Sequence, residues 1–415
     1  MPARADGAEA GPGAGRFRQL TLLAIVELLA MGLWFSASAV VPELESRWGL
    51  TDSGASWLTM SVQLGFVSGA VLSAVFTLAD VWDPRRLIAG SALLGAGATA
   101  AIPLVADGLS LALPLRFLTG VALAGVYPPG MKAMAGWFRE GRGMAIGVMI
   151  GALTIGSASP HLLRPLGGIG EWQSVLFLAA GLATIAALLA SIGLRPGPHQ
   201  APAAPFDPRA VRRILGDRAT MLANGGYFGH MWELYAVWTW VPVFIAASFA
   251  IDASEATTPE AASYLAFATI AAGGAGAAVA GVLADRLGRS LVTSVSMIVS
   301  AMCCLLAGFL FGGSPWLLAT LCLVWGFAVV ADSAQFSACV SELAEPRYVG
   351  TALTLQTAIG FLLTIATIRL LPVWEGAWGW EWAFAPLALG PLLGTWSMLA
   401  LRTRPESARI AGGLG

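Results

Sequence analysis

Residues 261–289 read AASYLAFATIAAGGAGAAVAGVLADRLGR: a run of 24 uncharged residues, then an acid and two arginines. A helix needs about 20 apolar residues to cross the hydrocarbon core of a bilayer. Asp285, Arg286 and Arg289 follow the run, as charged residues do where a helix leaves the membrane. The stretch therefore predicts a membrane-spanning helix with a charged loop at its end.

The same pattern of apolar runs and short polar loops extends over the 415 residues. Hydrophobic residues make up 57% of the chain and charged residues 11%, against about 25% charge in soluble proteins. Backbone groups find no water inside a bilayer, so each span is expected to be helical, and the alternation of a membrane barrel is absent. The fold class is an all-α polytopic membrane protein with twelve spans. They run over 19–42, 55–79, 86–106, 109–136, 142–166, 172–194, 219–249, 261–284, 290–312, 315–341, 349–373 and 380–401.

The composition excludes other classes of protein. A soluble enzyme would carry more charge, and a disordered chain would lack the 16 Trp and 18 Phe. The four cysteines all fall inside apolar runs, which does not suit a disulfide-stapled secreted protein. A net charge of −1 offers no basic surface to nucleic acid.

Lysine and arginine predict the orientation in the membrane. Eighteen arginines lie on the side that holds both chain ends, and three lie on the other side. Cytoplasmic loops carry this excess of positive charge. We expect a multi-pass protein of the cytoplasmic (inner) membrane with both termini cytoplasmic and the lipid bilayer as its partner.

The two halves of the chain echo each other at an offset of about 205 residues. Leu78-Ala79-Asp80 ends the second span, and Leu283-Ala284-Asp285 ends the eighth. The expected organisation is two pseudo-symmetric six-helix bundles joined by a linker. The boundaries are 1–17 (disordered cytoplasmic tail), 18–194 (first bundle), 195–218 (cytoplasmic linker), 219–402 (second bundle) and 403–415 (cytoplasmic tail).

Two motifs carry a family resemblance. Gly281 to Arg289 resembles the cytoplasmic loop signature of the major facilitator superfamily, and Arg116 to Gly125 resembles its fourth-helix motif. The resemblance implies a secondary transporter whose bundles rock about a central cavity, and a cytoplasmic gate in which acids latch to arginines. The alternative for the gate is simple anchoring by positive charge. The gate residues are Asp80, Arg85, Arg86, Asp285, Arg286 and Arg289.

Within the superfamily, the chain looks most like the bacterial nitrate/nitrite, cyanate and related small-anion permeases. The nitrate porters have an arginine in spans two and eight, and neither span has one here. A nitrate clamp is therefore not expected. The preferred substrate is an unassigned small polar or anionic solute, moved by proton-coupled alternating access.

Four charged side chains lie well inside spans: Glu27, Arg116, Glu233 and Asp332. A charge at the bilayer centre costs about 2.5–3.5 kcal/mol on insertion scales, so such residues are functional candidates. His230 lies three residues before Glu233, on the same helix face. We expect Glu233 with His230 to couple protons, with Glu27 as second choice, and the resemblance adds Arg116. The alternative is a set of buried, hydrogen-bonded structural residues.

Further residues are assigned to the solute path. The substrate cavity is predicted to include Trp232, Trp238, Tyr227, Tyr127, Gln63 and Asp332. Tyr127 precedes two prolines that interrupt the fourth span. The interruption is interpreted as a hinge, a binding element or a plain kink. His161, Arg164 and Arg369 lie at the outer side, where they attract an anion into a vestibule or only anchor the helix at the interface.

Several absences limit the function. No GxxxxGK[ST] loop, metal-ligand spacing or Ser/His/Asp elbow occurs, so no nucleotide, metal, cofactor or catalytic residue is expected. We expect a monomer whose partners are a small solute and a proton. The alternatives are proton-driven efflux of amphipathic compounds, favoured by the aromatic seventh and Gly-rich fifth spans, a transporter-like sensor or assembly factor without flux, and a membrane enzyme.

Overall fold

The computed structural model describes residues 12–76, 78, 82–138, 141–166, 171–199, 208–251, 257–345 and 348–415. Within these residues the secondary structure is helical, with no strand. Twelve helices among them are long and apolar enough to cross a membrane. The predicted all-α, multi-pass fold is confirmed.

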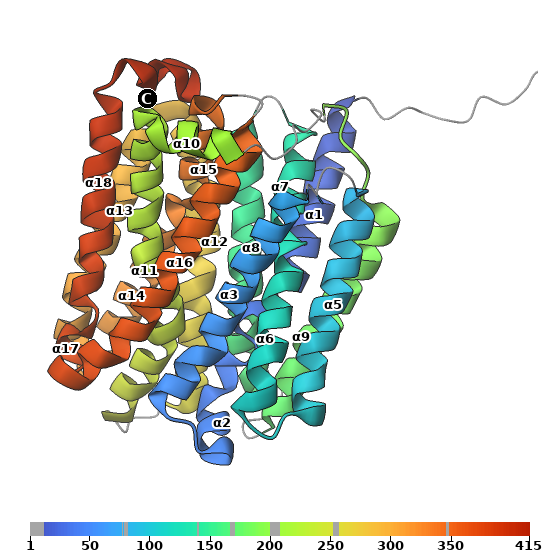
Figure 1. The fold of residues 1–415 in the computed structure, drawn as a ribbon. Helices are drawn as coiled ribbons and strands as arrows, with labels where there is room; N and C mark the ends of the chain where they lie inside the picture. Colours follow the sequence, from blue (N-terminus) through green and yellow to red (C-terminus); the bar gives the residue numbers. More distant parts are fainter. Residues whose placement is uncertain are drawn as a thin grey trace, which may run out of the picture.

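The first six spans form the N-terminal bundle, drawn in blue to green in Figure 1. Its fourth span is broken after Gly125, next to the predicted interruption at Tyr127, because the two prolines that follow cannot supply helical N–H groups. Its helices are α1 (Pro12–Phe35), α3 (Asp52–Val75), α5 (Pro84–Val105), α6 (Leu109–Ala124) with α7 (Tyr127–Ala135), α8 (Arg142–Leu166) and α9 (Trp172–Gly193).

The last six spans form the C-terminal bundle, in green to red. The tenth span is interrupted at Asp332, where the Gln335 amide donates to the Asp332 carbonyl at 2.9 Å. Its helices are α11 (Arg218–Ile251), α12 (Pro259–Leu287), α13 (Arg289–Leu306) with η2 (Ala307–Leu310), α14 (Pro315–Ala331) with α15 (Ser333–Leu343), α16 (Val349–Trp378), α17 (Trp380–Ala383), η4 (Ala385–Ala388) and α18 (Leu389–Arg402).

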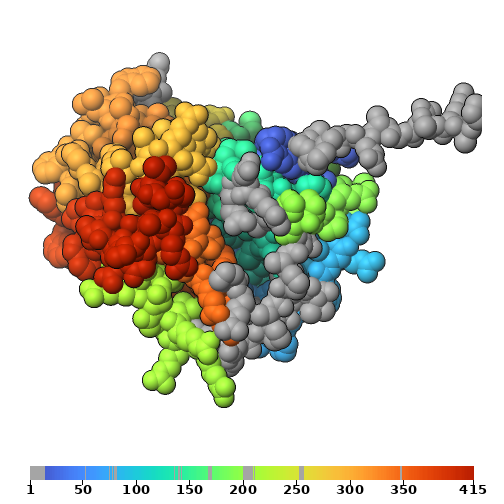
Figure 2. All heavy atoms as spheres, turned by 90° about the horizontal axis from the view of Figure 1, so that it is seen from above, coloured from blue at the N-terminus to red at the C-terminus, as the bar shows by residue number. Residues whose placement is uncertain are grey.

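Three shorter regions differ from the sequence-based expectation. The first span ends at Phe35 rather than 42, and the chain turns through η1 (Ser38–Val40) into α2 (Val41–Trp48). The expected linker contains α10 (Pro208–Gly216). The expected tail folds into η5 (Pro405–Arg409) and η6 (Ala411–Gly413), and covers one end of the C-terminal bundle, shown in red in Figure 2. We call this end, where α1 also begins, the terminal end.

Glycines bring the two bundles together along α8 and α12. A Cβ placed on Gly147 would lie 2.8 Å from the Ala277 carbonyl oxygen, and one on Gly151 equally close to that of Gly274. Small residues let membrane helices approach at backbone distance. Close packing therefore accounts for the Gly-rich fifth span.

Candidate functional site

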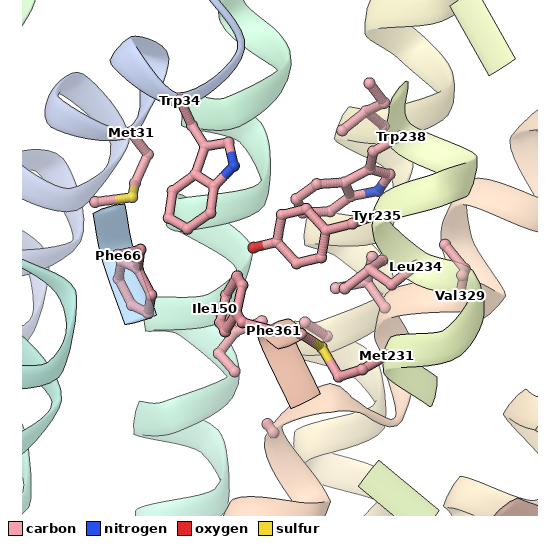
Figure 3. Close-up of a cluster of buried hydrophobic side chains, with 14 of the residues drawn as sticks. Met31, Trp34, Phe66, Ile150, Met231, Leu234, Tyr235, Trp238, Val329 and Phe361 are labelled. Carbon is pink, nitrogen blue, oxygen red and sulfur yellow. The ribbon is translucent and has the colours of Figure 1, made fainter. Parts of the chain in front are cut away.

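Six aromatic side chains meet where the two bundles face each other. Each of these six side chains is at most 4% exposed, so the two bundles are in closed contact where the rings meet. Figure 3 shows five of the rings pointing toward one another from both sides. This aromatic cluster consists of Trp34, Phe35 and Phe66 from the N-terminal bundle and Tyr235, Trp238 and Phe361 from the C-terminal bundle.

The rings make contact across the bundle interface. Phe66 and Phe361 have centroids 4.7 Å apart, and Trp34 lies 5.5 Å from both Tyr235 and Phe361. These separations fall within the range of favourable ring pairing. A solute could pass between the bundles at this position only if these rings moved apart.

Polar atoms around the rings lack partners. Gln63 of α3 accepts a hydrogen bond from the Thr364 hydroxyl of α16, which joins the bundles. Among the described residues, the Gln63 Nε2 and the indole nitrogens of Trp34 and Trp238 have no hydrogen-bond partner. Buried donors without acceptors are costly. Three donor nitrogens are therefore available to a ligand or to water beside the rings.

Arg116 of α6 holds the end of α1 in place. Its guanidinium donates to the carbonyls of Leu33 (2.8 Å), Trp34 and Leu58 (3.2 Å) and to the Ser36 hydroxyl (3.2 Å). The last carbonyls of a helix lack intrahelical partners and attract a cation. None of these partners is a carboxylate, so the contacts support a positioning role for Arg116, with Trp34 as the residue positioned.

The C-terminal bundle holds two of the predicted coupling residues, Glu233 and His230, and His230 has a partner other than the expected one. His230 Nδ1 lies 2.8 Å from Asp332 Oδ1, at ion-pair distance but without hydrogen-bond alignment. The Cys304 thiol donates to Glu233 Oε2 at 3.3 Å, and Glu233 Oε1 has no hydrogen-bond partner in the described chain. All four side chains are buried. The partner of His230 is thus Asp332 rather than Glu233.

Glu27 occupies the corresponding helix of the N-terminal bundle. It is fully buried, and neither carboxyl oxygen has a hydrogen-bond partner among the described residues. A Cβ on Gly130 of α7 would overlap with its Oε1, so the glycine makes room for the carboxyl group. Tyr127, at the start of α7, lies near enough for an electrostatic interaction. Glu27 is therefore a buried acid with no salt bridge or hydrogen bond to its carboxyl group in the part of the chain that the structure describes.

The two remaining cavity candidates lie inside the C-terminal bundle. Tyr227 packs edge-on against Phe336 of α15, with ring centroids 6.2 Å apart. The Trp232 indole donates to the Pro386 carbonyl at 3.3 Å and faces η4. Trp238 and Gln63 lie at the bundle interface, and Tyr227 lies near enough to Tyr127 of the N-terminal bundle for an electrostatic interaction across it.

The predicted gate at the end of α12 is built across two bundles. Asp285 lies 3.6 Å from Arg289, and its carboxylate fills the space beside Gly143 of α8, where a Cβ would come within 2.5 Å. Arg289 forms a closer ion pair with Glu342, at 2.8 Å. Arg286 is exposed. The contact between Asp285 and α8 is consistent with a latch between bundles.

In the corresponding loop of the N-terminal bundle, the structure describes only part of the predicted gate. Asp80 lies outside the described residues. Arg85 forms an ion pair with Asp83 at 2.6 Å, and Asp83 also caps α5 by accepting from the Arg85 amide at 2.9 Å. The hydrogen bond from the Arg85 side chain lowers the pKa of the Asp83 carboxyl. Arg86 is exposed.

The three predicted vestibule residues do not form one site. Arg164 is paired with Glu43 of α2 at 2.8 Å, so its charge is already balanced. His161 is buried, with no hydrogen-bond partner for Nε2 among the described residues. Arg369 is exposed on α16. The geometry favours anchoring over capture of an anion.

Sequence reasoning missed most of the aromatic cluster. One signal was present: Glu27 and Glu233 each precede a tryptophan by seven residues, Trp34 and Trp240. Trp34 joins the cluster, while the Trp240 indole donates to the Ile368 carbonyl at 3.0 Å. Phe66 and Phe361 lie in ordinary apolar runs, and nothing in the sequence distinguishes them from lipid-facing residues.

The chain resembles known transporters. It is 28% identical over 223 residues to the puromycin resistance protein pur8 of Streptomyces alboniger, covering 52% of this chain and 41% of that protein. It is 24% identical over 195 residues to the fujikurins efflux protein of Gibberella fujikuroi, covering 44% and 41%. The chain thus matches about two fifths of the length of each relative.

The fold has close counterparts among solved structures. The proton:xylose symporter XylE bound to 6-bromo-6-deoxy-D-glucose superposes with a TM-score of 0.73 at 13% identity, over 94% of this chain and 96% of that one. This likeness shows the fold alone. The family model described as Major Facilitator Superfamily matches residues 23–225 and 223–413, whereas the narrower resemblance to small-anion permeases is not confirmed. With both halves matched, the chain belongs to the Major Facilitator Superfamily.

Proposed function

We propose that this transporter moves an amphipathic compound with a flat apolar body, driven by protons. The observation that carries the proposal is the aromatic cluster, with three rings from each bundle at the interface. Aromatic side chains bind a flat apolar body well, and a few polar groups fix its orientation. The free N–H groups of Trp34, Trp238 and Gln63 supply such groups.

A small anion, the substrate preferred from sequence, has less support. An anion calls for a cation or a charge-assisted donor. Arg116 is occupied by carbonyls and Arg164 by Glu43. In the part of the chain that the structure describes, both cation–π contacts involve Arg16 and neither involves the aromatic cluster. The names of the two curated relatives, a resistance protein and an efflux protein, support export of an amphipathic compound.

Protons are proposed to act at the buried acids. Glu233 has one carboxyl oxygen without a partner, and Asp332 and His230 adjoin it in the same bundle. Desolvation favours the neutral acid, and exposure to water or ligand favours release of the proton. Glu233 is the main coupling residue in this proposal, and Glu27 the second.

The orientation is also proposed. The terminal end carries eighteen arginines in its loops and chain ends against three at the other end. Such an excess is typical of cytoplasmic loops. The terminal end is therefore assigned to the cytoplasm, the membrane to the cytoplasmic membrane, and the linker 195–218 and both tails to the cytoplasmic side.

The proposal is tested by transport in proteoliposomes under an imposed pH gradient. Ethidium, as a flat amphipathic cation, is compared with nitrate, cyanate and amino acids. We expect ethidium to be transported, and nitrate, cyanate and amino acids not to be transported. Phe361→Ala should lower ethidium transport about tenfold, since one ring contact of about 0.5–1.5 kcal/mol and further apolar area are lost. Trp396→Ala, at a side chain 67% exposed on α18, is the matched control.

Other outcomes would contradict the proposal. Transport of nitrate or cyanate with ethidium inert would return the substrate to small anions. Tight binding of ethidium without flux of any solute would favour a sensor. A chemically altered product would favour a membrane enzyme.

A further inference from the structure

The last turn of α15 is held by the chain segment that follows α18. A helix ends with carbonyl groups that lack intrahelical partners, and a cation there is favourable. The Arg409 guanidinium donates to the carbonyls of Glu342 at 3.3 Å and Leu343 at 2.8 Å. These two residues are the last of α15. Arg409 thus caps the helix from a distant part of the sequence.

The Glu342 carboxylate extends this contact. It receives two bonds from Arg289, at 2.8 and 3.1 Å, and a third from the Ala411 amide at 3.0 Å. Ile410, between the two tail residues, is fully buried. The hydrogen bonds of Arg409 and of the Ala411 amide, together with the burial of Ile410, therefore hold the segment after α18 against α15. We call Glu342, Arg409, Ile410 and Ala411 the C-terminal clamp.

The other end of α15 meets the proposed coupling residues. Asp332 is the residue at which α14 gives way to α15, and it lies 2.8 Å from His230. The helix has 11 residues, so it spans roughly 16 Å from this pair to the clamp. Gln335, one turn in, accepts from Arg289 at 2.7 Å. Arg289 thus contacts α15 near its start, at Gln335, and near its end, at Glu342, where the clamp adds the contacts of the tail.

We propose that Glu342 and Arg409 are positioning residues for the His230–Asp332 pair, acting through α15. Asp332 keeps helical backbone angles (φ −85°, ψ −20°) between α14 and α15, and contacts at Gln335, Glu342 and Leu343 hold α15 along its own length. Loss of the clamp lets α15 shift and changes the distance between Asp332 and His230. The positioning role rests on the proposed function of His230 and Asp332 in proton coupling. The contacts of the C-terminal clamp do not depend on that proposal.

The chain contains its own reporter of α15. Cys339 lies in the middle of this helix, and Cys303, Cys304 and Cys322 lie on α13 and α14. All four are buried. Labelling of the full-length protein in proteoliposomes with N-ethylmaleimide, resolved by peptide mass spectrometry, measures the opening of α15 against that of its neighbours.

Arg409→Ala is expected to raise the labelling rate of Cys339 about tenfold, equivalent to about 1.4 kcal/mol, with Cys322 unchanged. Glu342→Gln, of nearly the same shape, should act in the same direction. Arg404→Ala is the control, because Arg404 forms a long ion pair with Glu406 at 3.5 Å, and both residues belong to the tail rather than to α15. Arg409→Lys, which keeps a cation at the helix end, should restore much of the protection.

The positioning role is read from the pH profile of ethidium transport. Arg409→Ala should shift that profile, and Arg404→Ala should not. Unchanged labelling of Cys339 in both Arg409→Ala and Glu342→Gln overturns the clamp. Raised labelling with an unshifted profile overturns the positioning role. If His230→Asn and Asp332→Asn leave proton-driven transport intact, the proposed coupling pair fails, and the labelling result still decides whether the clamp exists.

Discussion

Arg116 in the N-terminal bundle makes four hydrogen bonds to α1 and α3, whereas the C-terminal bundle places Glu233 and the Asp332–His230 pair among the buried residues of α11 to α15. The N-terminal bundle uses its buried cation to fix a helix end. The C-terminal bundle places two buried acids and a histidine near one another. The two halves share a helix plan, yet they accommodate buried charge in different ways, and we propose a structural role for Arg116 and a coupling role for Glu233.

The largest effect is expected from Arg116→Met. The substitution leaves the carbonyls of Leu33, Trp34 and Leu58 without their donor, and hydrogen bonds to charged groups contribute about 1.5–3 kcal/mol each. We expect a loss of at least about 3 kcal/mol, measured as a fall in the thermal unfolding midpoint in detergent. Arg86→Met, at an exposed site, is the control. Equal midpoints for the two variants would show that Arg116 is not structural.

Glu233→Gln addresses the coupling bundle. The amide cannot release a proton, so proton-driven accumulation of ethidium should be abolished while counterflow of labelled substrate stays measurable. Glu260→Gln, at an exposed acid on α12, controls for the loss of one charge. If accumulation and counterflow both survive intact, Glu233 is not the coupling residue.

Glu27→Gln sharpens the comparison, because neither carboxyl oxygen of Glu27 has a hydrogen-bond partner among the described residues. We expect a fall in accumulation of only a few fold, smaller than for Glu233→Gln, since a lone acid exchanges its proton without the Asp332–His230 pair nearby. Initial rates of accumulation measure both variants. A larger effect at Glu27 would move the coupling role to the N-terminal bundle.

The smallest effect is expected at Asp83, outside the membrane spans. Asn caps a helix about as well as Asp, so Asp83→Asn should cost no more than about 1 kcal/mol, from the ion pair with Arg85. Because Arg85 lowers the pKa of Asp83, the carboxylate contributes stability above about pH 4, the usual carboxyl pKa, and loses it as the pH falls. The difference in midpoint between wild type and variant should be larger at pH 7 than at pH 3.

The sequence by itself determined the membrane fold. Twelve apolar runs such as 261–284 have no stable state in water and must form helices in lipid, because only helices satisfy their own backbone there. It also identified Glu27, Arg116, Glu233 and Asp332, because a charge inside such a run is costly enough to be conspicuous.

Only the tertiary structure decided how these groups are used. Helical spacing placed His230 beside Glu233, but the partner of His230, Asp332, is about 100 residues away and is brought there by the packing of α11 against α15. Phe66 and Phe361 are indistinguishable from lipid-facing residues until the bundles meet. The periodicity of apolar residues in a sequence shows which face of a helix is buried. Which helix packs against that face depends on contacts between segments that are distant in the sequence.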